Sequence, residues 1–166
     1  MFEMTRILLI IFAALLAGCS AEPQTGPGEV RWDREICERC VMAVSDPNYS
    51  AQIRGGAVGG RSKLYKFDDI GCAVLWLEQQ PWRENPAIEL WVNSHRDGEW
   101  IDARSAWYVT GKITPMDYGL GAQREQTDNS VDFTQAVELI HEKEKQLDSH
   151  THTPISTPDK LPSIGQ

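Results

Sequence analysis

The chain has 166 residues, of which 24 are acidic and 16 are basic, so its formal net charge is −8. This acidic balance argues against nucleic-acid binding, which needs a basic face, and against electrostatic attraction to anionic lipid. The length is sufficient for one domain with a substantial core.

The N-terminus has the anatomy of a secretory signal. One basic residue precedes an apolar run over residues 7–14, and Leu16-Ala17-Gly18 places small residues just before Cys19. This pattern resembles the bacterial lipobox, which implies a signal peptide over residues 1–18 and lipidation of Cys19. The alternative is an ordinary cleaved signal with an incidental cysteine. The residue after Cys19 is Ser20 and not aspartate. By resemblance to the sorting rules of bacterial lipoproteins, this favours the periplasmic face of the outer membrane, which the protein would reach after secretion across the inner membrane.

A Pro- and Gly-containing polar stretch follows the signal and ends near residue 32. We interpret residues 19–32 as a flexible tether that lifts the domain off the membrane. The domain itself is expected over residues 33–147. From residue 148 the chain is polar and contains three prolines, so we expect residues 148–166 to be a disordered tail.

The domain begins with a sulfur-rich stretch, Cys37-Glu38-Arg39-Cys40-Val41-Met42. Thiol and thioether ligands are soft, and they select Cu(I), zinc or iron–sulfur centres over hard cations. Cys40 and Met42 are two residues apart, so in an extended backbone both side chains would leave the same face. This spacing predicts a clip for one soft metal ion. Besides Cys19, the cysteines are Cys37, Cys40 and Cys72, an odd number that leaves at least one thiol unpaired within the chain.

Hydrophobic patterning predicts an α+β domain of two similar ββαβ-type units. A capping carboxylate, Asp68 or Asp69, starts the first helix, and Asp132 with Gln135 forms a capping box for the second. The apolar surface of the first helix is broad, so we expect this helix to be largely buried. Cys72 lies roughly opposite its main apolar stripe, and we expect a buried thiol without a ligand role. The expected strands are 49–54, 64–67, 88–93, 99–103, 106–110 and 122–126, the last at an edge, and the expected helices are 69–80 and 132–147.

An irregular segment over residues 111–121 contains Thr114-Pro115-Met116-Asp117. A methionine next to proline has a restricted backbone, which suits a preformed ligand position. Most single methionines, however, fill gaps in the core. Met116 is therefore either a ligand or a core residue.

Several motifs in this order resemble the NosL family, the copper-binding lipoproteins associated with maturation of nitrous-oxide reductase. The motifs are Cys19 in the lipobox, Cys40-Val41-Met42 followed by Asp46-Pro47-Asn48-Tyr49-Ser50-Ala51-Gln52, Lys66-Phe67-Asp68-Asp69-Ile70, Ser105-Ala106-Trp107-Tyr108-Val109, and Thr114-Pro115-Met116 with Gly121-Ala122.

The resemblance implies a non-enzymatic metallochaperone that binds Cu(I) and delivers it to a cuproenzyme such as nitrous-oxide reductase. It implies a fold similar to that of the organomercurial lyase. The family's Cys-Gly-Met motif maps onto Cys40 and Met42, with Val41 in place of glycine, and its loop methionine maps onto Met116. Cys37 is not part of the family pattern, and it could add a thiolate or form a disulfide with Cys40.

Three other interpretations remain open at this point. Cys37 and Cys40 could form the CxxC of a thiol–disulfide oxidoreductase, which would need the motif at the start of a helix. They could be half of a zinc site, although a second ligand pair is missing. They could also be a structural disulfide in an anchored interaction domain without metal.

Overall fold

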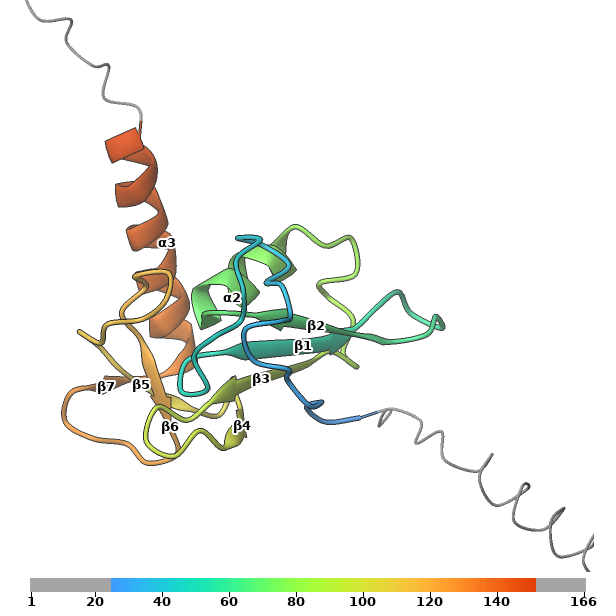
Figure 1. Ribbon diagram of the computed structural model, residues 1–166, viewed down its shortest axis with the longest axis horizontal. Coiled ribbons are helices and arrows are strands. Elements are labelled where there is room, and N and C mark those ends of the chain that lie inside the picture. The colour runs from blue at the N-terminus through green and yellow to red at the C-terminus, as the bar shows by residue number, and fades with distance from the viewer. Residues whose placement is uncertain (1–24, 152–166) are drawn as a thin grey trace, which may run out of the picture.

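The computed structural model describes the backbone of residues 25–151 and the side chains of residues 25–147. The expected signal peptide, Cys19 and almost all of the expected tail lie outside these residues. The described chain forms two antiparallel sheets and two helices, which confirms the α+β class (Figure 1). The elements are β1 (Ala51–Gly55), β2 (Lys63–Phe67), α2 (Ile70–Glu78), β3 (Glu89–Asn93), β4 (Trp100–Asp102), β5 (Trp107–Val109), β6 (Gly121–Gln123), β7 (Ser130–Val131) and α3 (Phe133–Thr151).

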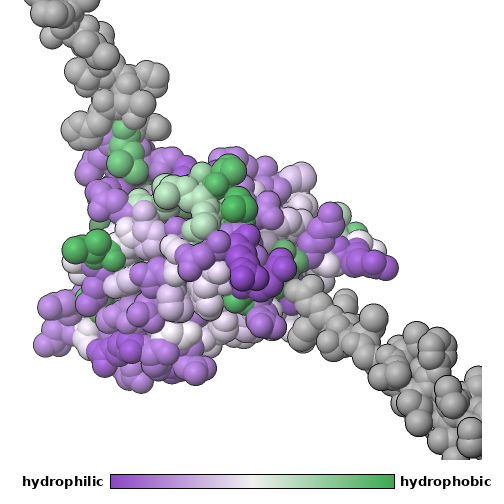
Figure 2. All heavy atoms as spheres, viewed as in Figure 1, coloured by the Kyte–Doolittle hydropathy of each residue, from purple (hydrophilic) through white to green (hydrophobic). Residues whose placement is uncertain are grey.

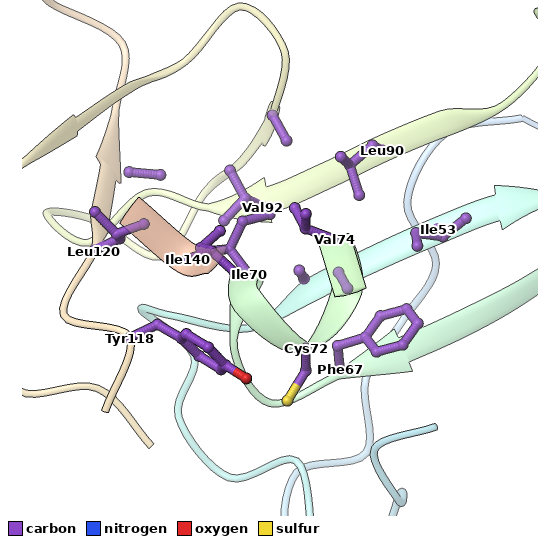
Figure 3. Packing of buried hydrophobic residues seen from close by; sticks show 14 of the residues in the cluster. Ile53, Phe67, Ile70, Cys72, Val74, Leu90, Val92, Tyr118, Leu120 and Ile140 are labelled. Carbon is purple, nitrogen blue, oxygen red and sulfur yellow. The ribbon is translucent and has the colours of Figure 1, made fainter. Parts of the chain in front are cut away.

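The first sheet has the strand order β2-β1-β3-β4, and α2 packs against β1 and β2. All five residues of β1 are buried, although Gln52 and Arg54 are polar. Side chains alternate along a strand, so these two share the face opposite to Ala51 and Ile53. On the other face, Val74 of α2 and Leu90 of β3 belong with Ile53 to the buried core (Figure 3).

The N-terminal segment covers the polar face of β1. The Gln52 side chain accepts a hydrogen bond from the Gly28 backbone N–H at 2.8 Å and donates one to the Gly28 carbonyl at 3.0 Å. Arg54 Nε donates to the Gly26 carbonyl at 2.9 Å, and Val30 is buried. Residues 26–30, which we expected in the tether, therefore belong to the packed domain, because their backbone groups satisfy buried polar side chains.

The second sheet has the order β6-β5-β7, with β6 at an edge as expected, and α3 follows it. The capping box of α3 is present: Asp132 N donates to Gln135 Oε1 at 3.2 Å, and Gln135 N donates to Asp132 Oδ1 at 2.9 Å. No strand follows α3 within residues 25–151, so this unit is three strands and a helix. The helix runs to Thr151, past the expected end at 147.

A short parallel bridge between Ser94 and Ala122 joins the two sheets, and His95 N donates to the Ala122 carbonyl at 2.8 Å. None of the described helices is long and apolar enough to span a bilayer.

Close packing at Gly71 holds α2 against the segment that contains Met116. A Cβ atom at Gly71 would lie 2.3 Å from the ring of Tyr118, which is buried beside the N-terminus of α2 (Figure 3). Only glycine permits this contact, because any side chain would overlap the aromatic ring.

We therefore expect Gly71→Ala to lower the free energy of unfolding by about 1–3 kcal/mol through overpacking. Denaturant unfolding measures the change. Gln79→Ala, at the exposed C-cap of the same helix, is the control and should change stability by no more than about 0.5 kcal/mol. Equal stability of Gly71→Ala and wild type would show that the Tyr118 segment moves aside freely.

Candidate metal centre

The sulfur-rich stretch forms a closed turn. An antiparallel bridge between Ile36 and Ala43 closes it, Cys37 N donates to the Met42 carbonyl at 2.8 Å, and Val41 N donates to the Cys37 carbonyl at 3.0 Å. Val41 has a φ of 61°, in the left-handed region that favours glycine. The extended backbone that we expected for Cys40 and Met42 is therefore wrong, because the turn hydrogen bonds curl the chain at Val41.

The turn is attached to the end of β2 and the start of α2. Glu38 N donates to the Lys66 carbonyl at 3.1 Å, and Ser45 N donates to Asp68 Oδ1 at 3.0 Å. Lys66 Nζ also lies 2.7 Å from Glu35 Oε2 just before the turn, and both side chains are mostly buried. These contacts fix the turn over the strand–helix junction.

This attachment brings a third cysteine to the turn. The Sγ atoms of Cys37, Cys40 and Cys72 all lie within 4.8 Å of one another. Cys72 is in the first turn of α2, where Asp69 caps the helix by accepting a hydrogen bond from Gly71 N at 3.1 Å. Figure 3 shows the Cys72 sulfur leaving the helix beside Phe67, at the end of α2 where the Tyr118 hydroxyl lies. We call these three side chains the thiol cluster.

The three thiols differ in exposure. Cys37 and Cys72 are fully buried, whereas Cys40 is partly exposed. Two apolar side chains next to Cys40 face solvent: Val41 is 75% exposed and Met42 is 53% exposed. Figure 2 shows a small patch of apolar atoms on a face that is otherwise mostly hydrophilic. Cys40 is therefore the thiol that solvent or a partner reaches first.

The two predicted methionine ligands lie on different segments. Met42 is at the exposed edge of the turn. Met116 is partly buried against the core, and its backbone N donates to Asp69 Oδ2 at 3.3 Å, which places its loop at the N-terminus of α2. Its packing fits the core role, its position fits the ligand role, and both roles remain predictions.

Hydrogen bonding within the cluster stabilises one thiolate. A hydrogen bond from Cys72, together with backbone N–H donors from Asp68 and Cys40, lowers the pKa of Cys37 to about 5. Burial and the interaction with Cys37 raise the pKa of Cys40. The hydrogen bond to Cys37 and burial raise the pKa of Cys72. At neutral pH the metal-free cluster thus holds one buried anion and two thiols that donate to it.

A cation from the turn is fixed close to the cluster. Arg39 pairs with Glu144 of α3 and donates to the Tyr118 hydroxyl at 3.0 Å, and that hydroxyl donates to Glu144 at 2.7 Å. Burial raises the pKa of Tyr118, so the hydroxyl keeps its proton. This network ties the turn to α3. It also fixes a permanent positive charge on Arg39, the residue just before Cys40.

The cluster has the donor set of a soft-metal site. Three sulfurs at this separation can bind one ion, and soft thiolate ligands suit Cu(I) and zinc. Within the described part of the chain, no histidine or carboxylate oxygen joins the three sulfurs at that separation. The arrangement therefore offers three-coordinate sulfur ligation, and a tetrahedral zinc site would lack its fourth protein ligand.

The sequence interpretation found Cys37 and Cys40 but not Cys72. The broad apolar surface of its helix and the usual burial of cysteine correctly predict that Cys72 is buried. They say nothing about which segment covers it. The available signal was the odd number of cysteines, which left one thiol without a role.

At the sequence level, no protein-family model and no curated protein matches the chain. Among solved structures the chain is similar to the copper chaperone NosL from Shewanella denitrificans, with a TM-score of 0.44 and 16% identity, over 73% of this chain and 88% of the other. A likeness this weak establishes neither membership of the NosL family nor its function for this chain.

Exposure predicts the order in which the thiols react. We expect iodoacetamide to modify Cys40 of the folded, metal-free protein before Cys37 and Cys72, because the other two sulfurs are buried. The rate should rise with pH, since the raised pKa keeps Cys40 protonated near neutrality. Peptide mapping by mass spectrometry gives the order, and the protein in denaturant, where all three should react, is the control. Modification of Cys72 as fast as Cys40 would contradict the placement of the cluster.

Proposed function

We propose that this protein is a lipid-anchored, extracytoplasmic Cu(I)-binding metallochaperone that passes copper to a cuproenzyme. The observation that carries the proposal is the thiol cluster, in which Cys37, Cys40 and Cys72 bring three sulfurs within 4.8 Å of one another. The three thiolates are the ligands in this proposal. Met42 and Met116 are candidates for a further, weaker sulfur contact.

Cu(I) fits this donor set better than other common ions. Hard cations such as Mg²⁺ and Ca²⁺ require oxygen ligands, and the cluster contains none. Zn²⁺ in structural sites takes four ligands in tetrahedral geometry, and the described residues supply three. Copper in its monovalent state is bound by soft thiolate and thioether ligands, which this cluster and its neighbouring methionines offer.

Delivery, client and location are further parts of the proposal. A three-coordinate ion with one ligand, Cys40, near the surface leaves room for a sulfur or nitrogen ligand of an acceptor to attack. The lipobox pattern at Cys19 supports an anchor at the periplasmic face of the outer membrane. Nitrous-oxide reductase is the client that the sequence resemblance to the NosL family suggests.

The oxidoreductase alternative lacks its structural context. A reactive CxxC is activated at the N-terminus of a helix, whereas Cys37 and Cys40 lie in a turn that leads to strand β1. The alternative of a structural Cys37–Cys40 disulfide is tested by counting thiols. In this structure none of the three cluster cysteines forms a disulfide. A quantitative disulfide in the purified periplasmic protein would favour that alternative.

Substitution of single cysteines tests the ligand set. We expect Cys37→Ser, Cys40→Ser and Cys72→Ser each to weaken Cu(I) binding by at least about 100-fold, or about 2.7 kcal/mol, because each removes one of three thiolates. Competition with a chromogenic Cu(I) chelator under reducing conditions measures the affinity. Unchanged affinity in Cys40→Ser would end the proposal, and unchanged affinity in Cys72→Ser alone would restrict the ligands to the turn.

Methionine variants serve as matched comparisons in the same assay. Met42→Leu and Met116→Leu keep the apolar bulk and remove only the thioether sulfur. An affinity loss in either variant assigns that methionine to the site. Equal affinity in both assigns the metal to thiolates only.

The protonation of the cluster predicts a steep pH dependence. With Cys37 already ionised, since its pKa is about 5, and with the pKa values of Cys40 and Cys72 raised, binding to three thiolates must displace two protons. The apparent Cu(I) affinity should therefore fall about 100-fold for each pH unit between about pH 8 and pH 6. The same competition assay across that range gives the slope. A tenfold change per unit would mean that only one protonated thiol joins, and no change would exclude these ligands.

A further inference from the structure

A second polar site lies where the two sheets meet. A cavity of about 340 Å³ opens beside the Ser94–Ala122 bridge, and it shares no residue with the thiol cluster. Three basic side chains line it, those of His95, Arg96 and Lys112. This gathering of basic groups contrasts with the net charge of −8 of the whole chain.

Gly121 of β6 allows two of these side chains to approach each other. A Cβ atom at Gly121 would lie 2.9 Å from Cγ of His95 and 3.0 Å from Cγ of Lys112. Both side chains therefore pack over the bare backbone of this glycine, and a larger residue would push them apart.

Gln123 fixes the positions of Arg96 and His95 relative to each other. Its side chain is fully buried, and its Oε1 accepts a hydrogen bond from Arg96 Nε at 3.0 Å and lies 3.3 Å from His95 Nε2. Its Nε2 donates to the Glu125 carbonyl at 2.7 Å and to Thr127 Oγ1 at 3.2 Å. Because both ends of the amide are engaged, Gln123 has one orientation and holds Arg96 and His95 side by side.

Within the described part of the chain, neither the Arg96 guanidinium nor the Lys112 ammonium group is in an ion pair, although Asp128 also lines the cavity. Burial lowers the pKa of His95, and the nearby charges of Lys112 and Arg96 lower it further. Bringing like charges together costs free energy unless an anion joins them.

We propose that this cavity binds a small oxyanion of the phosphate class, such as inorganic phosphate or a short phosphomonoester. The Arg96 guanidinium, positioned through Nε, has terminal N–H groups that match two oxygens of a tetrahedral anion, and Lys112 supplies a point charge. The amide of Asn129, which also lines the cavity, can donate to a third oxygen. The site is independent of copper binding.

Titration of the metal-free protein with inorganic phosphate, and separately with glycerol 3-phosphate, tests the proposal. Isothermal calorimetry or phosphorus NMR at constant ionic strength should show saturable binding at one site. Arg96→Gln/Lys112→Gln should weaken this binding by at least about tenfold. Lys63→Gln/Arg83→Gln removes the same charge at exposed positions away from the cavity and should leave the affinity unchanged.

The outcomes separate the possibilities. Tighter binding of the ester than of inorganic phosphate would extend the site to an organic substituent. Non-saturable binding of both anions, or equal weakening in the two double variants, would overturn the proposal. Gly121→Ala offers a second, steric test: if circular dichroism shows it folded, it should also weaken binding, because its Cβ would displace the Lys112 side chain. Unchanged affinity would contradict the assigned geometry.

Discussion

The attachment of the cysteine turn to the β2–α2 junction is the constraint on which the candidate metal centre depends. Two backbone N–H groups, of Glu38 and Ser45, anchor the turn to the Lys66 carbonyl and the Asp68 carboxylate. Without this attachment, Cys37 and Cys40 would remain a local pair, and Cys72 would be a buried thiol in a helix. Tertiary hydrogen bonding therefore converts a CxxC sequence into a cluster of three sulfurs.

Charge balance explains why the cluster can exist below the surface of an acidic protein. One thiolate is stabilised by N–H donors and by the neighbouring thiols, and Cys72 lies near the positive end of α2. Arg39 adds a fixed cation, held by Glu144 and Tyr118. Because Cu(I) brings one positive charge to up to three negative ligands, the bound state would be anionic, and these groups would offset part of that charge.

Local signals in the sequence were sufficient to predict most of the fold. Asp69 caps α2, the Asp132–Gln135 box caps α3, and the paired strands β1–β2 and β3–β4 lie where strands 49–54, 64–67, 88–93 and 99–103 were expected. Each of these features depends on residues close in sequence. The curled backbone at Val41 depends on hydrogen bonds across a turn that strand patterning does not reveal. The meeting of Cys72 with the turn depends on packing between segments far apart in the chain, which no local pattern encodes.

The uneven exposure of the three sulfurs bears on how such a site would work. Two buried thiols would hold an ion away from water and oxidants, which favours retention of a monovalent metal. The partly exposed Cys40, beside the exposed apolar side chains of Val41 and Met42, provides the contact through which an incoming ligand could act. A site with all three sulfurs buried would bind the ion and release it slowly, whereas one with all three exposed would lose it to any competing thiol. The described arrangement lies between these limits, which is compatible with the transfer between proteins that we propose.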